Sequence, residues 1–126
     1  MTGNIVFSAT QTFTAAGIDL DGPFEQASEA VSALDVDCSA GNYFTKAISI
    51  NSTFTFSNIP TSGTAYSFTL EVDVTGTSTA ITWPASVKWP DDTAPSLTDT
   101  KTHLFMFVTN DGGTTWRGAA LVDYTT

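Results

Sequence analysis

Residues able to do acid–base or nucleophilic chemistry are few in this chain of 126 residues. His103 is the single histidine and Cys38 the single cysteine. General acid–base catalysis needs a group that exchanges a proton near neutral pH, and nucleophilic catalysis needs a nucleophile beside a base. His103 opens a strongly apolar run, where a histidine usually serves as a hydrogen-bonded strand-end residue, and no serine lies in a Gly-x-Ser-x-Gly turn. We therefore expect no catalytic residues and no enzymatic activity.

Metal binding is the second chemistry to consider. A zinc site would have only one histidine, one cysteine and carboxylates to draw on, without ligand-like spacing. Loop carboxylates can hold Ca²⁺, and four aspartates fall in expected loops: Asp91, Asp92, Asp99 and Asp111. They follow no EF-hand spacing, and Asp in a turn usually accepts backbone hydrogen bonds. We expect no metal and no other cofactor, with calcium as the alternative. Because Cys38 is the single cysteine, an intrachain disulfide is excluded, and we expect Cys38 to be a small buried apolar residue.

The charge of the chain restricts its partners. Four Lys and Arg stand against 13 Asp and Glu, a formal net charge of -9. Such a surface repels nucleic acid and anionic membranes, so neither is expected as a partner. No apolar run approaches the ~18 residues of a membrane span, and the first residues lack the pattern of a signal peptide. We expect a soluble protein that is not secreted by that route.

The elements that must position these residues are strands. Residues 66–74 alternate apolar and polar without a break, residues 51–57 alternate likewise, and residues 42–50 do so more loosely. Residues 104–108 are apolar on both faces, which predicts a central strand or one whose second face meets another subunit. Asn110-Asp111-Gly112-Gly113 then predicts a hairpin into a last strand over 115–124. The pattern favours an all-β fold, an antiparallel β-sandwich of jelly-roll-like type.

The N-terminal part differs from the rest. Residues 23–34 have helical spacing of apolar side chains, with Pro23 near the start and Glu25 in the first turn. One short helix near 23–34 is therefore predicted, with an irregular crossing loop as the alternative. We expect residues 1–40 to form an arm that packs on the domain or on a neighbouring subunit, and residues 41–126 to form the β-sandwich domain.

A proline-rich loop carries two of the three tryptophans. Trp83-Pro84 and Trp89-Pro90 are followed by Pro95. In one interpretation the tryptophans fill the core under a stiffened loop; in the other they form a surface that stacks on sugar rings or anchors a protein interface. The candidate interface residues are Trp83, Trp89, Trp116, Arg117, Phe105 and Phe107.

Segments in a fixed order resemble a known type of domain. They are GNYFTKAI with NSTFTFSNIP, AYSFTLEV, ITWPASVKWPDDTAPSL and LFMFVTNDGGTTWRGA. From residue 41 to the end the chain resembles a β-domain of virion structural proteins of tailed bacteriophages, cyanophages among them. In relatives this domain occurs at the ends of tail-fibre-like chains and in small stand-alone virion proteins. The first forty residues lie outside the resemblance.

The resemblance implies a structural function without catalysis. Because 126 residues leave no room for a fibre shaft, we expect a capsid decoration (cement) protein that binds the assembled shell as a homotrimer and stabilises it. Its partners would be copies of itself and the major capsid protein or another virion protein. Its place would be the capsid exterior of the virion, after synthesis in the host cytoplasm. The alternative is a tail-fibre domain that binds a receptor or glycan.

Overall fold

The computed structural model describes residues 3, 5–14 and 16–126, and in these residues nearly all regular structure is strand. One 3₁₀ turn, η1 (Pro90–Asp92), interrupts the series. The strands are β1 (Glu29–Ala30), β2 (Asp35–Asp37), β3 (Tyr43–Ile48), β4 (Ser52–Thr53), β5 (Thr55–Ser57), β6 (Tyr66–Val74), β7 (Ile81–Thr82), β8 (Val87–Lys88), β9 (Lys101–Thr109) and β10 (Trp116–Thr125). The all-β class is confirmed, and so are the strands expected over 66–74 and 115–124.

The main sheet is mixed rather than antiparallel. Its order is β1-β3-β6-β9-β10-β8. Strand β9 runs antiparallel to both of its neighbours, β6 and β10, as the expected hairpin after β9 requires. The pairs β1–β3, β3–β6 and β8–β10 are parallel, so the expectation of a purely antiparallel fold is wrong. The connection from β3 to β6 is long enough for the crossover that parallel pairing needs.

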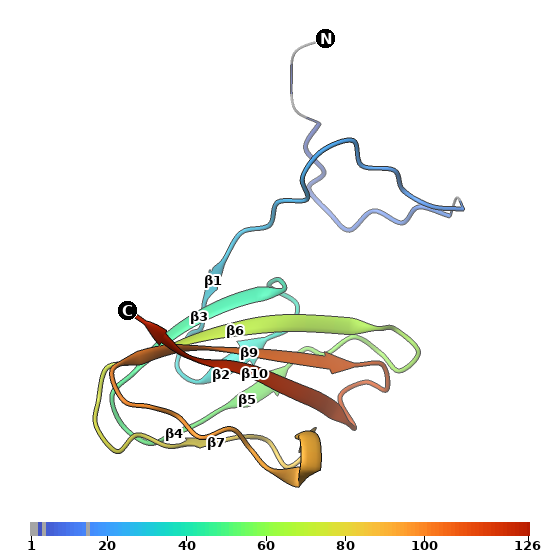
Figure 1. Ribbon diagram of the computed structural model, residues 1–126. Coiled ribbons are helices and arrows are strands. Elements are labelled where there is room, and N and C mark those ends of the chain that lie inside the picture. Colours follow the sequence, from blue (N-terminus) through green and yellow to red (C-terminus); the bar gives the residue numbers. More distant parts are fainter. Residues whose placement is uncertain (1–2, 4, 15) are drawn as a thin grey trace.

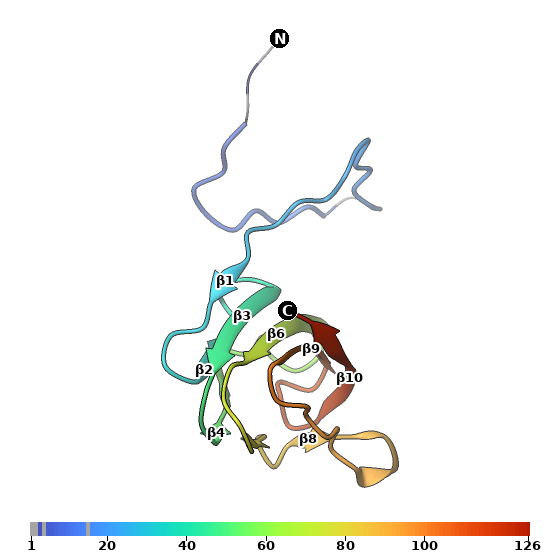
Figure 2. The same cartoon turned by 60° about the vertical axis from the view of Figure 1, so that its left-hand side comes forward.

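Two short parallel pairs explain where that crossover goes. Strand β2 pairs with β5, and β4 pairs with β7. Both pairs lie on one side of the main sheet, as Figure 1 shows below β6 and β9. From β1 to β7 the chain therefore coils: strands β1, β3 and β6 join the main sheet, and the chain forms β2, then β4 and β5, and then β7 on the opposite side. The view in Figure 2 runs closer to the strand direction and shows this winding.

The core lies between the main sheet and these short strands. Alternate residues of β6 and β9 point inward and are buried, among them Phe68, Phe105 and Phe107. Phe56 of β5 reaches them from the opposite side, with ring centroids 5.1 Å from Phe68 and 5.2 Å from Phe107. Val36 of β2 is also fully buried. The alternation visible in the sequence thus separates the inner from the outer face of the main sheet.

The loop with the two Trp-Pro steps closes this core. Trp83 stacks on Phe54 with the ring centroids 5.5 Å apart, and its ring centroid lies 4.7 Å from that of Phe105. Trp89 lies on Gly118 of β10, where an added Cβ would meet the indole ring at 2.8 Å. Glycine is thus the residue that lets the indole lie against this strand. This arrangement matches the interpretation in which the tryptophans fill the core.

The predicted helix near 23–34 is absent from the structure. Glu29 and Ala30 pair instead with Phe44 and Thr45 at the edge of the main sheet, and Ala33 adopts a left-handed φ of 49°. Backbone pairing with a sheet edge outweighs the modest helix propensity of this serine- and alanine-containing stretch.

The extension expected over 1–40 has two parts. Residues 29–40 include β1 and β2 and supply Val31, Val36 and Cys38 to the core. Every described residue from 3 to 28 is exposed. We call residues 3–28 the arm and the remainder the body. Figure 1 shows the arm standing off the outer face of the main sheet, on the side away from β5 and β7.

Candidate interaction surface

His103 is a structural residue. Its side chain is fully buried on β9. Nε2 lies 3.0 Å from the carbonyl oxygen of Thr98, and Nδ1 accepts the backbone N–H of Asp123 at 3.2 Å. Because Nδ1 accepts a hydrogen bond, the proton belongs on Nε2, which donates it to Thr98. Both ring nitrogens are engaged with the backbone and the ring has no access to a substrate.

The loop aspartates stabilise turns in separate places. Asp99 accepts the backbone N–H groups of Ser78 at 2.7 Å and Thr79 at 3.3 Å. Asp111 accepts the backbone N–H of Thr115 at 2.9 Å, and this bond is the main reason why the pKa of Asp111 is lowered. Asp91 and Asp92 both have left-handed φ angles in η1. In residues 3, 5–14 and 16–126, no three histidine, cysteine or carboxylate side chains group as metal ligands would.

Cys38 is a buried thiol. Its sulfur lies 3.8 Å from the carbonyl oxygen of Val36, and burial raises the pKa of Cys38 to about 11. A thiol with so high a pKa is almost entirely protonated at neutral pH and is a poor nucleophile.

The six candidate interface residues divide between core and surface. Phe105, Phe107 and Trp116 are at most 1 % exposed, so they offer no surface to a partner. Trp83 and Trp89 are half-buried against the core. Arg117 is exposed on β10. It alone of the six lies on the outer face of the main sheet.

The outer face of β6, β9 and β10 has an apolar and a polar half. The apolar half consists of residues that alternate with the core positions of β9 and β10: Leu104, Met106, Val108, Ala119 and Leu121. Val108 is 45 % exposed and Leu121 52 %. The polar half lies toward β3, where the Tyr43 hydroxyl donates to Glu71. This hydrogen bond is the main reason why the pKa of Tyr43 rises to about 12.

A hollow of about 450 Å³ lies on the apolar half. Its walls include Ser67 and Thr69 of β6, Met106 and Val108 of β9, and Arg117 of β10. Gln26 completes the lining from the base of the arm. The hollow is therefore an apolar floor with a cation at its rim.

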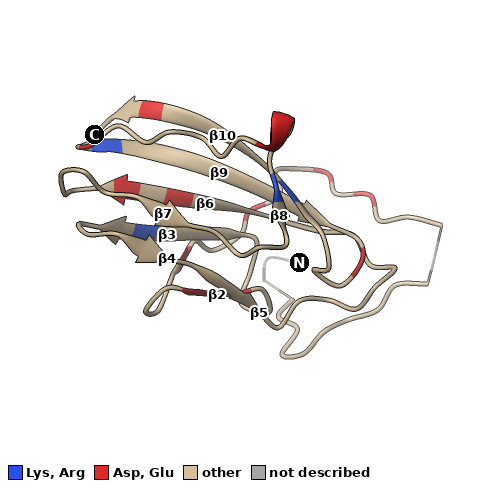
Figure 3. Cartoon of the chain, turned by 90° about the horizontal axis from the view of Figure 1, so that it is seen from below, with Lys and Arg blue, Asp and Glu red and all other residues tan. Residues whose placement is uncertain are grey.

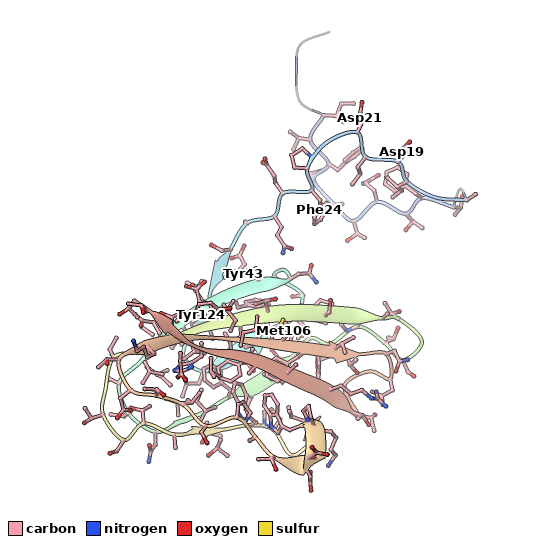
Figure 4. The ribbon with its side chains drawn as sticks, in the orientation of Figure 1. Asp19, Asp21, Phe24, Tyr43, Met106 and Tyr124 are labelled. Carbon is pink, nitrogen blue, oxygen red and sulfur yellow. The ribbon has the colours of Figure 1, made fainter. Side chains whose placement is uncertain are left out.

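The arm carries an unusual amount of exposed apolar surface. Its large apolar side chains are 59 % to 84 % exposed: Ile5, Val6, Phe7, Phe13, Ile18, Leu20 and Phe24. The hydrogen bonds found among its described residues are local, from Gln11 to Ala9 and from Gly22 to Leu20. Contiguous exposed apolar surface of this kind marks an interaction site in soluble proteins. Figure 4 shows Phe24 on the arm, with Tyr43, Met106 and Tyr124 on the main sheet beneath it.

Charge separates the arm from the body. The arm holds Asp19, Asp21 and Glu25, whereas the four Lys and Arg residues all lie at position 46 or later. Figure 3 shows acidic positions in both parts and basic positions only on the body. The arm is thus an acidic, apolar segment, and an apolar surface with a cation suits it.

Sequence reasoning missed two parts of this surface. The apolar side chains of the arm before residue 23 gave no element to place, and the helical spacing over 23–34 predicted a helix that the structure does not have. Met106 was visible as the alternate partner of Phe105 and Phe107, but the sequence did not show which set would be covered. The alternation could be read from the sequence, but the side of the strand on which the core lies could not.

No protein-family model, curated protein or solved structure matches this chain. In the described part of the chain, no helix has the length and apolar character needed to cross a membrane.

Proposed function

We propose that this chain is a virion structural protein of a tailed bacteriophage, a capsid decoration (cement) protein that binds the assembled shell as a homotrimer. The ordered segments between residues 41 and 119 support the phage assignment by resemblance. The observation that carries the binding role is the arm, whose seven large apolar side chains stand exposed beside a body with a closed core. Such a segment is suited to attachment and has no evident use in a protein that acts alone.

The mechanism is binding thermodynamics. A protein that binds the assembled shell and not its free subunits stabilises the shell by mass action, and many equivalent sites multiply the effect. The partners are copies of this chain and the major capsid protein or another virion protein. The net charge of -9 disfavours contact with packaged nucleic acid and suits a place on the capsid exterior, after synthesis in the host cytoplasm.

The finer fold belongs to the same proposal. We infer a β-sandwich of jelly-roll-like type in which the main sheet is one layer and the short pairs β2–β5 and β4–β7, with the tryptophan loop, form the other. Packing of Phe56 and Trp83 onto Phe107, with ring centroids 5.2 Å apart in both cases, supports two facing layers.

Copy number in purified virions tests the function. A decoration protein should be present in hundreds of copies per particle and should bind again to shells from which it has been stripped. Quantitative mass spectrometry of virions and of rebound shells measures both. A count of tens, with binding to host glycans, would replace the proposal by the tail-fibre alternative. Absence from virions would overturn both functions.

A further inference from the structure

We propose that the arm of one copy binds on the outer face of β6, β9 and β10 of a second copy, so that the subunits of the homotrimer exchange arms. This inference rests on the homotrimer of the proposed function, but it does not depend on where in the virion that trimer sits. The two surfaces in this contact are the arm and the hollow around Met106 and Arg117.

The apolar surfaces fit in kind and in amount. The arm exposes seven large apolar side chains, with Phe7 59 %, Phe13 60 % and Phe24 77 % exposed. The outer face exposes an apolar strip along β9 and β10 around the hollow of about 450 Å³. A specific interface of standard size takes about 20–30 residues a side, which is close to the length of the arm. Contact between the arm and the outer face would therefore bury the exposed apolar side chains of both.

Charge favours the apolar half of the face. The arm has three carboxylates, Asp19, Asp21 and Glu25, and no Lys or Arg. Arg117 stands at the rim of the hollow, while the depression on the polar half of the face has two carboxylates, Glu71 and Asp73, against one cation, Lys46. An acidic arm is attracted to the β10 side and repelled from the β6 side, which sets its position across the sheet.

Length favours a second copy over the arm's own body. Gln26, at the base of the arm, already borders the hollow of its own chain. The roughly 20 residues that precede it can span about 65 Å when extended. Six strands cover only about 29 Å across a sheet. The arm leads away from the main sheet in Figure 1, so its far part is placed to reach a neighbour.

Arm exchange also explains why the number of subunits is limited. The arm and the outer face are different surfaces, so two copies can exchange arms reciprocally as a dimer, or several copies can pass their arms head to tail. Head-to-tail contacts either close into a ring or continue as a filament. A ring of three buries every arm and every outer face and leaves none free.

The experiment measures self-association of the purified full chain without any viral particle. Sedimentation should show an oligomer for the wild-type chain. Met106→Glu places a charge on the apolar floor, Arg117→Glu reverses the rim charge, and a third variant lacks residues 1–24. Met106→Glu should weaken association at least about tenfold because it strikes the centre of the contact. Arg117→Glu should also weaken association, and the armless chain should be monomeric. Ile50→Glu is the matched control, because Ile50 is 74 % exposed away from this face.

A mixing experiment separates arm exchange from other modes of assembly. The Met106→Glu chain keeps an intact arm, and the armless chain keeps an intact face. Mixed in equal amounts, they should form a complex that neither forms alone. Thermal unfolding of each variant tests whether the body is folded. If the Met106→Glu chain does not fold, the Arg117→Glu chain replaces it in the mixture.

Three results would overturn the inference. They are a monomeric wild-type chain, an armless chain that still assembles, or a mixture that stays monomeric although both chains are folded. A monomeric wild type with full binding to shells would remove arm exchange and leave the decoration function standing. A wild-type chain that forms the oligomer but is absent from virions would remove the decoration function and leave arm exchange standing.

Discussion

Two truncations distinguish the structural from the binding part of the first forty residues. A chain lacking residues 1–28 loses the exposed arm and keeps β1 and β2. A chain lacking residues 1–40 also loses Val31, Val36 and Cys38, which are 7 %, 0 % and 4 % exposed. We expect the first chain to fold as the full chain does. The second should lose most of its stability.

The magnitude follows from burial. Removing a fully buried valine side chain from the core forfeits about 1.5–3 kcal/mol, so Val31 and Val36 together contribute ~3–6 kcal/mol. A domain is stable by only about 5–15 kcal/mol in total. The deletion also leaves β5 without its partner β2 and exposes core side chains such as Phe56. At about 4 °C per kcal/mol, the melting temperature should fall by at least ~12 °C.

Thermal unfolding followed by tryptophan fluorescence measures this, since Trp116 lies in the core beside Phe56. Two substitutions in the full chain provide the matched comparison. Val36→Ala should destabilise by about 2 kcal/mol because it opens a cavity. Ile50→Ala, at a body position that is 74 % exposed and outside the proposed arm contact, should leave the melting temperature unchanged.

One result would refute the reasoning. If the chain lacking residues 1–40 melted cooperatively at the temperature of the chain lacking residues 1–28, then β1 and β2 would not be part of the body. The arm would then extend to residue 40, and Val36 would not be part of the core of the body.

Three further predictions concern single residues. Gly76→Ala should destabilise by about 1–3 kcal/mol in urea unfolding, because its Cβ would lie 2.0 Å from the backbone oxygen of Ser49; an unchanged midpoint would contradict this. Asp111→Asn should be less stable than wild type at neutral pH. The hydrogen bond from Thr115 lowers the pKa of Asp111, so the stabilisation by the carboxylate is present above the ordinary carboxyl pKa of 3.8 and is lost as the pH falls through the lowered value. The stability difference should therefore shrink in acid, and a constant difference would count against this cause. Cys38, whose pKa burial raises to about 11, should react with iodoacetamide only after unfolding, and rapid labelling of the folded chain would show that the thiol is accessible.

Strand positions were predictable because alternation is a local property. Tyr66–Val74 is a strand over the whole length of its alternating pattern. The turn signal at Asn110–Gly113 does join two antiparallel strands, and His103 has the backbone hydrogen bonds that were expected of it. In each case the information lies within a few residues of the position concerned.

Strand direction was not predictable in the same way. The alternating strands predicted an antiparallel sandwich, yet between β3 and β6 the chain passes through β4 and β5 on the opposite side, and after β6 it passes through β7. Alternation gives the same pattern for parallel and antiparallel neighbours. The predicted helix failed for a related reason, because Glu29 and Ala30 each pair with a strand residue fifteen positions away.

The sequence by itself determined that the chain is built from strands, that it is acidic, and which side chains share a face of each strand. Only the tertiary structure decided which face is covered. It buried Phe105 and Phe107 within the chain and left Met106 and Val108 on the outer face, although Phe105 and Phe107 had been predicted as interface residues. The physical reason is that periodicity records which residues lie together, while burial depends on what packs against them, and those partners come from distant parts of the chain.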